Sequence, residues 1–590
     1  MRSFTRFFAL CLCGACAQAP STTPPSDAIR LNQLGFYPDG PKTAALVDAE
    51  ATRFYITTPD QQDTVFDGDL SAARQASYSP RRVRLADFSA LRDTGTFVLV
   101  IPEVGASTPF RIGEAVYREV TRASIKAFYF QRASTDLPER YAGSWQRPGG
   151  HPDTQVKVHA SAASPERPEG TVLSSPRGWY DAGDYNKYVV NSGITMGTLL
   201  SLYEDFPDHF AHVSLNLPES GNPLPDLLDE VLWNLRWMLT MQDPHDGGVY
   251  HKLTTASFEG MVTPQQATHQ RYVVQKGTAA TLDFAAVMAQ AARVLRPFEQ
   301  TLPGLADSCL TAAVAAWQWA EQHPAVVYDQ EALNQQFDPD ITTGAYGDKN
   351  FEDERLWAAA ELLVTTGQEQ YFRAVEWFPE DHIPLPSWAQ VRALGYYTLI
   401  RQDTLPPVAQ EVLPRLRQMV QAMADTLLAD VDAQPYGTVM GQSPRDYIWG
   451  SSAVAANQGV ALLQAYRLTH DDAYWKGAVS NLDYLLGRNA TGYSFVTGHG
   501  TKTPQHPHHR LSVSDGVEAP VPGLLSGGPN ARAPQQDHCT SYTSDVPDET
   551  FSDDDCSYAS NEIAINWNAP LAYLTGALEA LHTPISTQPR

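Results

Sequence analysis

Residues 225–242, PDLLDEVLWNLRWMLTMQ, have the pattern of an amphipathic helix. Leu228, Val231 and Leu235 recur at the spacing of about 3.6 residues that places them on one helical face. Similar apolar patterns recur from about residue 116 to residue 583, and we count roughly twelve such segments. Paired helices in that number favour a barrel with an inner and an outer ring over a four-helix bundle. An irregular helical array has the same periodicity and remains an alternative.

The region ahead of these helices has a different character. Between residues 29 and 112 the chain offers short β-rich runs, such as TAALV (43–47) and TFVLVIP (96–102), separated by Gly, Pro and Asp. Runs at that spacing predict a small antiparallel sandwich, which we assign to residues 28–113. Residues 20–27, PSTTPPSD, have the composition of a linker. The helical domain is assigned to residues 114–583 and a short tail to residues 584–590.

The first nineteen residues have the pattern of an export signal. Arg2 and Arg6 precede a short apolar run, and small residues follow it. Two processing routes are open: lipid attachment at Cys16, or cleavage after Ala17 or Ala19, which would release a soluble protein. We therefore expect an exported protein that is secreted, periplasmic or anchored to the outer membrane by lipid, with no other contact with a membrane.

The composition is that of a folded, acidic protein. The chain has 590 residues, a formal net charge of −25, 43% hydrophobic residues and 18% charged residues. That length exceeds what one hydrophobic core usually serves, so two domains are expected. Nucleic acid is not expected as a partner, because phosphate binding needs basic stripes and the sequence has none. An uncharged ligand is easier to reconcile with the acidic field.

Three of the six cysteines lie outside the export signal. Cys309 falls in an apolar helical stretch and is predicted to be a buried free thiol. Cys539 and Cys556 lie in one loop-rich segment, and in an exported chain they are expected to form a disulfide. No CxxC pair and no His/Cys set has zinc-binding spacing.

The loop RGWYDAGDYNKYVVNSG (177–193) places two carboxylates three residues apart. Two close carboxylates disfavour joint ionisation, so the pKa values of Asp181 and Asp184 should separate, and one of them can serve as a base. Aromatic residues crowd the pair, and such rings stack on the apolar faces of sugars. A calcium loop and a plain Asp-rich turn are the alternatives.

A second acidic segment, FSDDDCSYASNEIAINWNAP (551–570), contains Glu562 among Ile563, Ala564 and Ile565. A carboxyl group in an apolar setting has a raised pKa and can stay protonated as a general acid. The run of three aspartates at 553–555 is predicted to be a solvated loop.

The stretch SFVTGHGTKTPQHPHHR (494–510) contains His499, His506, His508 and His509. A metal site is one interpretation, but the spacing matches neither HExxH nor a Cys/His finger. We instead expect hydrogen bonds to hydroxyl groups, with Arg510 steadying a carboxylate. A surface histidine-rich loop is the alternative.

These three loops, in this order, resemble the signatures of family 9 glycoside hydrolases, the cellulases built on an (α/α)6 barrel. GWYDAGDYNKY is similar to the base loop of that family, and the two later segments resemble its histidine and acid signatures. The start of the chain, IRLNQLGFYPDGPKTAALV, resembles the immunoglobulin-like domain that precedes many bacterial catalytic domains of the family. The resemblance covers residues 28 to 583.

The resemblance implies roles for individual residues. Asp184 becomes the general base, Asp181 helps to hold the attacking water, and Glu562 becomes the general acid. His508, Arg510 and Asp553 match supporting positions of the active site. The implied reaction inverts the anomeric carbon in one displacement, which requires roughly 6.5–9.5 Å between the two catalytic carboxyl groups.

Four aromatic residues are candidate sugar platforms. They are Trp357, Trp388, Trp449 and Tyr493. Any of them can instead belong to the core of a helix-rich protein.

The resemblance also bears on metals. Many relatives with the leading domain carry a Cys/His zinc site before the base loop, but residues 140–164 contain no cysteine, so zinc is not expected. The family often binds calcium near a DE pair that opens a barrel helix, and Asp353 and Glu354 are such a pair. The further acidic ligand expected near Trp388 is not evident. Acids that complement a helix dipole are the alternative explanation.

The sequence as a whole predicts an inverting endo-β-1,4-glucanase that acts on cellulose or soluble β-glucans. We expect a monomer that needs no catalytic cofactor, with the small domain bracing the barrel. An exo-acting cellobiase, cellodextrinase or exo-β-glucosaminidase of the same fold is the nearer alternative. A non-catalytic, surface glycan-binding lipoprotein is the more distant one.

Overall fold

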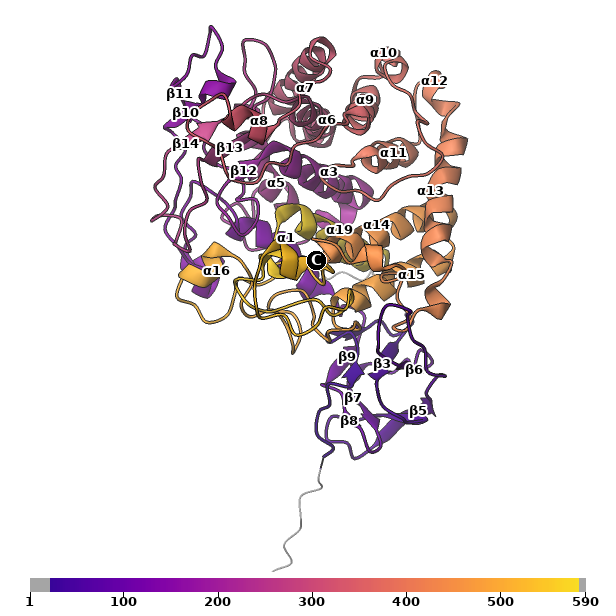
Figure 1. Cartoon of the computed structure of the whole chain (residues 1–590). Helices are drawn as coiled ribbons and strands as arrows, with labels where there is room; N and C mark the ends of the chain where they lie inside the picture. The colour runs from indigo at the N-terminus through magenta and orange to yellow at the C-terminus, as the bar shows by residue number, and fades with distance from the viewer. Residues whose placement is uncertain (1–21, 583–590) are drawn as a thin grey trace, which may run out of the picture.

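The structure is a computed structural model that describes residues 22–582. The predicted export signal and the predicted tail lie outside the described residues. Figure 1 shows a small β domain, in indigo, below a larger helical domain. The predicted boundary at residue 113 falls between the last strand of the β domain and the first long helix. No helix within residues 22–582 is long and apolar enough to cross a membrane.

The β domain is a sandwich of two sheets. Its strands are β1 (Ile29–Arg30), β2 (Gly35–Phe36), β3 (Thr43–Val47), β4 (Arg53–Thr57), β5 (Thr64–Asp69), β6 (Val83–Asp87), β7 (Gly95–Ile101), β8 (Gly105–Ala106) and β9 (Phe110–Ile112). One sheet has the order β1-β3-β6 and the other β2-β9-β7-β4-β5, with β8 paired to β7. The ring of Phe36 lies edge-on to Phe88 and Phe110 in the core, with centroids 5.3 and 5.6 Å away.

One pairing in this sandwich differs from the prediction. β2 and β9 run parallel, whereas an antiparallel sandwich was expected. Both strands carry the chain towards the helical domain, where Tyr37 follows β2 and hydrogen-bonds to Glu579 at 2.8 Å. Their shared direction makes the pair parallel.

The helical domain is the predicted (α/α)6 barrel. The inner ring consists of α3 (Val189–Asp205), α6 (Thr278–Leu295), α9 (Glu352–Thr366), α11 (Arg392–Arg401), α14 (Ser451–Thr469) and α19 (Ile565–His582). The outer ring consists of α1 (Arg118–Phe130), α5 (Asp226–Thr240), α7 (Leu305–Gln322), α10 (Glu369–Arg373), α13 (Leu413–Leu428) and α15 (Asp472–Leu485). Outer and inner helices alternate along the chain. The inner helices pack in the order α14, α19, α3, α6, α9, α11, and α13 joins the last of these to the first.

Small residues allow the inner helices to pack closely. Nearly every residue of α6, with the sequence TAATLDFAAVMAQAARVL, is buried. On α3 a Cβ atom at Gly197 would lie 2.4 Å from Cζ2 of Trp357 on α9, so no larger residue fits there without displacement. Helix α6 is therefore buried on all sides, as expected for a helix of the inner ring.

A buried ionic cluster ties the inner ring together at one end. Asp205, the last residue of α3, pairs with Arg401 at 2.6 Å and also with Arg467. Its neighbour Glu204 pairs with Arg293 at 2.7 Å. These contacts join α3 to α6, α11 and α14. The 17 residues of α3 span about 25 Å, so the cluster lies far from the base loop that precedes this helix.

The long loops contain structure that the sequence did not predict. A five-stranded sheet has the order β11-β10-β14-β13-β12. Its strands are β10 (Val156–Val158), β11 (Val172–Leu173), β12 (Lys187–Tyr188), β13 (Lys252–Thr255) and β14 (Arg271–Val273). Strands of two to four residues are too short for an alternating pattern to emerge.

Short helices complete the loops. They are α2 (Glu139–Ala142), α4 (Pro207–Phe210), α8 (Gln330–Asn334), α12 (Pro407–Gln410), α16 (Arg510–Ser514), α17 (Ala533–Gln536) and α18 (Tyr558–Asn561), with 3₁₀ turns at Gly143–Trp145, Ala160–Ala162, Arg296–Phe298, Val431–Ala433 and Pro444–Asp446. Cys539 and Cys556 form the predicted disulfide, with Cα atoms 5.5 Å apart. Cys309 is a buried free thiol, as predicted.

The β domain contacts the segments that lead into two of the three signature loops. Gln33 accepts hydrogen bonds from the backbone N–H groups of Thr501 and Lys502, at 2.7 and 2.8 Å. Arg81 pairs with Glu549 at 2.5 Å. The small domain therefore braces both the histidine loop and the acidic segment.

The β domain also contacts the barrel itself, and the buried amide of Asn32 offers a test of that contact. It donates to Asp483 at 2.8 Å and to the Tyr117 hydroxyl at 3.0 Å. We expect Asn32→Ala to cost about 1–3 kcal/mol, because it leaves Oδ1 of the buried Asp483 carboxylate without its donor, while Arg488 still pairs with the other oxygen at 3.2 Å. The measurement is the midpoint of urea unfolding, with the exposed Gln62→Ala as the matched control. An Asn32→Ala midpoint equal to that of the control would contradict the bracing.

Candidate active site

The base loop lies between α1 and α3 and is anchored on both sides of its first carboxylate. The backbone of Asp181 accepts from the N–H of Ile565 at 2.8 Å and donates to the carbonyl of Asn186 at 3.0 Å. Its carboxylate is fully buried and accepts two 3.0 Å hydrogen bonds from Asn191 and one of 3.2 Å from the Tyr346 hydroxyl. Burial, and next the charge of Asp184, hold the pKa of this carboxyl well above its usual range.

The second carboxylate of the loop has one oxygen bound and one free. Oδ2 of Asp184 accepts from the Tyr188 hydroxyl at 3.1 Å and from the side-chain amide of Asn186. Within residues 22–582, Oδ1 has no hydrogen-bond donor. A carboxylate held through one oxygen can accept a proton from water through the other.

Gly183 is the point at which the three signature loops meet. Its carbonyl accepts from the backbone N–H of Arg510 at 3.1 Å and from the guanidinium of the same residue at 2.8 Å. A Cβ atom at position 183 would lie 2.2 Å from the carbonyl oxygen of His508 and 3.2 Å from Oε1 of Glu562. Only glycine permits this approach, and His508 and Glu562 are themselves joined by a β-bridge.

The environment of Glu562 keeps its carboxyl protonated. Burial raises the pKa of this group to about 8, with further contributions from the charges of Asp184 and then Asp181. The guanidinium of Arg510 and the backbone N–H of Gly183 act in the opposite direction. A carboxyl group that holds its proton at neutral pH can act as a general acid.

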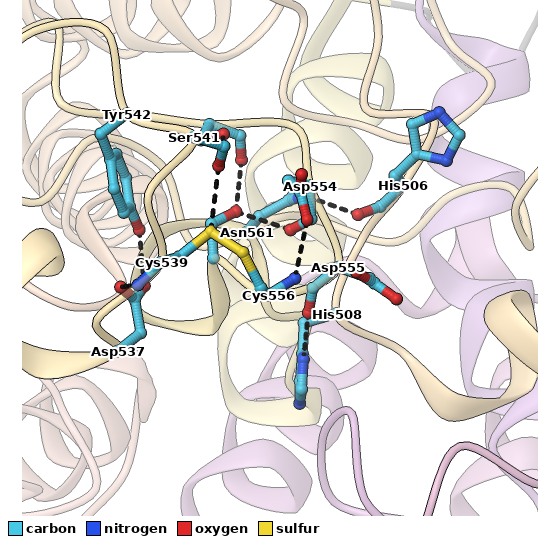
Figure 2. The surroundings of a disulfide bond; sticks show 12 residues. His506, His508, Asp537, Cys539, Ser541, Tyr542, Asp554, Asp555, Cys556 and Asn561 are labelled. Atoms are coloured by element: carbon cyan, nitrogen blue, oxygen red, sulfur yellow. Dashed lines mark hydrogen bonds between the residues drawn. A yellow bond between two sulfur atoms is a disulfide. The ribbon is translucent and has the colours of Figure 1, made fainter.

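The histidine loop presents an unprotonated ring nitrogen. Nδ1 of His508 lies 2.6 Å from the carbonyl oxygen of Asp555, which can only accept, so this nitrogen carries the hydrogen. Burial lowers the pKa of His508, which leaves the ring neutral and Nε2 as an acceptor. Nε2 can therefore receive a hydrogen bond from a hydroxyl group. Figure 2 shows this contact beside the disulfide, where Cys556 directly follows Asp555.

Two supporting residues act differently from the expectation. Arg510 donates to the carbonyls of Gly183 and Glu259, at 2.8 and 2.9 Å, and not to a carboxylate. The charge of Arg510 nevertheless lowers the pKa of Glu562, so the arginine favours that carboxylate through space and without a hydrogen bond. Asp553 accepts from the backbone N–H groups of Gln505 and His506, at 2.8 and 2.9 Å, and so shapes the histidine loop.

The four predicted sugar platforms have different surroundings. Trp357 is 0% exposed and packs between inner helices, so it has no free face, and its prediction as a platform is wrong. Trp388 is half-buried, with its ring 5.3 Å from that of Tyr346, the residue that bonds Asp181. Trp449 is 39% exposed and lies 5.7 Å from Tyr558.

Tyr493 is set further back. It is half-buried, with its ring 5.1 Å from that of Phe551 and the Lys502 ammonium 4.7 Å from its centroid. Trp388 and Trp449 remain the platform candidates. The ring of Trp388 lies next to Tyr346, and the ring of Trp449 lies next to Tyr558, which in turn lies 5.5 Å from His508.

Sequence reasoning missed the partners of the two aspartates. Asn186 lies within the base loop and Asn191 in the first turn of α3. Both are close to the aspartates in the sequence, and this proximity could have marked them as partners. Tyr346 lies in a patternless loop more than 150 residues away, and no local feature marks it. Lys252 on β13 was also missed.

Buried acids gather at the start of α9. Asp353 and Glu354 are fully buried, and so is Asp283 on α6. Within the part of the chain that the structure describes, both carboxylate oxygens of Asp283 and of Glu354 lack hydrogen-bond partners. Burial and mutual repulsion hold the pKa values of Asp283 and Glu354 well above their usual range. Such unpartnered buried carboxylates fit an oxygen-preferring cation.

The acids around α9 are not preassembled at the distances of a metal site. Among the described residues, the one set of three ligand atoms within 4.8 Å of one another is Cys539, Asp554 and Cys556, whose sulfurs are joined in the disulfide. The acids around α9 are spaced more widely, so a bound cation would draw them together. Near Trp388, where an acidic ligand was expected, Gln390 offers a buried amide oxygen without a partner.

Comparisons with known proteins agree with this geometry. Residues 117–575 match the model of glycosyl hydrolase family 9, and residues 24–106 match that of the cellulase N-terminal ig-like domain. The chain is 46% identical to the xyloglucan-specific endo-beta-1,4-glucanase BoGH9A of Bacteroides ovatus, over 96% of each chain. It is 32% identical to endoglucanase D of Acetivibrio thermocellus, over 94% of this chain and 84% of the other.

Solved structures give the same result. The structure titled Bacteroides ovatus GH9 superposes with a TM-score of 0.90 at 45% identity, over 95% of this chain and 100% of the other. AaCel9A in complex with cellobiose-like isofagomine gives 0.82 at 33% identity, over 94% of this chain and 99% of the other. The family match covers most of the chain, and the chain belongs to glycosyl hydrolase family 9.

Proposed function

We propose that this chain is an inverting endo-β-1,4-glucanase that hydrolyses cellulose or soluble β-glucans. The observation that carries the proposal is the close approach of the Glu562 carboxyl, whose pKa burial raises to about 8, to the backbone of Gly183 between Asp181 and Asp184. Names of relatives support the activity, since BoGH9A is a xyloglucan-specific endo-beta-1,4-glucanase and the Acetivibrio thermocellus relative is an endoglucanase. Xyloglucan, a soluble β-glucan, therefore belongs among the substrates to test.

The proposed reaction is a single displacement. Glu562 donates its proton to the glycosidic oxygen as the bond from that oxygen to the anomeric carbon breaks. Oδ1 of Asp184 takes a proton from a water molecule, whose oxygen forms the new bond to the opposite face of the same carbon. Asp181, in this account, helps to hold that water. One water is consumed, the base gains a proton, the acid loses one, and the anomeric configuration inverts.

The surrounding residues bind and orient the sugar. Nε2 of His508 accepts a hydrogen bond from a sugar hydroxyl, and Asp553 acts through the histidine loop and not on the reacting atoms. Trp388 and Trp449 supply apolar faces on which sugar rings can stack. A non-catalytic glycan-binding protein has no need of a carboxyl group kept protonated at neutral pH, which favours the enzyme.

We also propose that the acids around α9 bind calcium. Asp283, Asp353 and Glu354 would supply oxygen ligands, and the amide oxygen of Gln390 would replace the missing acid. The chemistry that calcium adds is structural: it neutralises buried charge and joins α6 to α9. Export and a monomeric state are proposed as well, and the disulfide supports export because such bonds persist in oxidising compartments.

The acid assignment is tested by Glu562→Gln. We expect kcat on xyloglucan or carboxymethylcellulose to fall by about 10²–10⁴-fold, because no proton reaches the leaving oxygen. Rates are measured by release of reducing ends. Exposed Glu518→Gln, in a groove next to the histidine loop, is the matched control and should keep the wild-type rate. A Glu562→Gln enzyme as fast as the control would refute the assignment.

The pH dependence of kcat/KM tests the state of the acid. Because the pKa of Glu562 is raised to about 8, the carboxyl stays protonated below that pH and loses its proton as the pH rises through it. Activity should therefore decline on the alkaline side with a midpoint near pH 8. An alkaline midpoint below pH 6 would show that another group is the acid.

Calcium is tested by thermal unfolding after treatment with EDTA. Adding calcium at a hundredfold excess over its Kd should stabilise the protein by about 2.7 kcal/mol, because it binds only the folded state. Asp283→Asn should abolish this response, whereas the exposed Asp403→Asn should keep it. If calcium leaves the melting temperature of the wild type unchanged, the site is not a calcium site.

A further inference from the structure

We propose that Lys252 is a positioning residue whose positive charge keeps Asp184 ionised as the base. This inference rests on the proposed function, in which Asp184 receives the proton of the attacking water. It is drawn from the place of the lysine in the loop sheet, from its hydrogen bonds and from the charges around the base.

Lys252 lies directly across a strand pair from the base loop. It opens β13, and its Cα partner in the antiparallel pairing with β12 is Tyr188. The side chain is fully buried, with Nζ 5.5 Å from the centroid of the Tyr188 ring. The hydroxyl of that ring donates to Oδ2 of Asp184 at 3.1 Å. The lysine therefore lies behind a residue that holds the base.

The hydrogen bonds of the ammonium group match its charged form. Nζ donates to the carbonyl of Gly344 at 2.6 Å, to Oε1 of Gln330 at 2.7 Å and to Oγ1 of Thr343 at 3.0 Å. An ammonium has three N–H donors and finds three acceptors, of which the Gly344 carbonyl and the Gln330 amide oxygen can only accept. Within residues 22–582, no carboxylate lies within salt-bridge distance of this nitrogen.

A directional chain of hydrogen bonds runs from the lysine to the base. Because Thr343 Oγ1 accepts from Lys252, its own hydrogen can point to Oγ1 of Thr254, 2.7 Å away. The Thr254 hydroxyl lies within donating distance of Oδ1 of Asn186, at 3.1 Å, and of the carbonyl of Thr255, at 2.9 Å. The amide of Asn186 donates to Oδ2 of Asp184. When Thr254 donates to Asn186, every donor in this chain points towards the carboxylate and stabilises its ionised form.

The titratable groups around Asp184 include one cation. The titratable groups that its charge influences are Asp181, Tyr188, Lys252, Tyr346, His508 and Glu562. Of these, two are carboxyls, two are phenols and the histidine is neutral, so Lys252 is the one that carries the opposite charge. Arg510 also lies nearby, but its donors are directed to backbone carbonyls.

The dependence is mutual. The groups that face Lys252 are Asp184, His251, Tyr188 and Tyr328. Burial lowers the pKa of Lys252 to about 7, and the charge of Asp184 opposes that change. Burial also holds the pKa of His251 at about 3, so this ring is neutral. An ionised Asp184 is thus the acidic group that offsets the cost of burying the ammonium.

The test is the acidic limb of the pH profile of kcat/KM in Lys252→Met. Loss of the cation makes the ionised form of the base less favourable, so the limb should move by about one pH unit to higher pH. Activity then falls about tenfold below the limb and little at neutral pH. Lys252→Arg, which keeps the charge, should restore the wild-type limb. Exposed Lys157→Met on β10 is the matched control.

Two results would overturn the inference. One is a Lys252→Met profile that is lowered equally at all pH values with its limb unmoved, which is what a merely structural role predicts. The other is an unshifted profile at full activity. A wild type inactive on every β-glucan would instead refute the proposed function.

A second measurement decides the inference without any activity. A double-mutant cycle of unfolding free energy at pH 6, with Lys252→Met and Asp184→Asn, measures the coupling between the two charges. The expected shift of one pH unit corresponds to a coupling of about 1.4 kcal/mol. A coupling indistinguishable from zero would show that the lysine does not act on the base.

Discussion

The crowding of three carboxyl groups around the backbone of one glycine is the constraint on which the rest of the structure depends. Gly183 approaches the carbonyl of His508 and the carboxyl of Glu562 so closely that no side chain fits at its position. Burial and mutual repulsion then raise the pKa values of Asp181 and Glu562. The proposed catalysis uses this repulsion directly, because it keeps a proton on the acid and leaves the base to be stabilised by its donors.

The remainder of the fold holds these groups in place against their repulsion. The inner helices pack closely through small residues, and the ionic cluster of Asp205 ties them together at the end far from the site. The β domain and the disulfide brace the loops that carry His508 and Glu562. Each brace acts on a loop that has little regular structure of its own.

The sequence contained much of this account but not all of it. Helical periodicity predicted the rings of the barrel, and the three signature loops predicted Asp181, Asp184, Glu562 and His508 as members of one site. Sequence could not assign Tyr346 or Lys252, because each reaches the site from a distant loop through tertiary packing alone. The prediction of Trp357 as a sugar platform failed because the burial of an aromatic ring depends on its neighbours, which the residue type does not reveal. The strands of the loop sheet were too short to leave a pattern.

The stereochemistry of the first product tests the central claim most directly. Proton NMR during hydrolysis of a β-linked cellooligosaccharide or xyloglucan oligosaccharide distinguishes the two anomers before mutarotation mixes them. A single displacement by water, with Asp184 as base and Glu562 as acid, predicts that the α-anomer appears first. Initial formation of the β-anomer would require a covalent intermediate and would contradict the account.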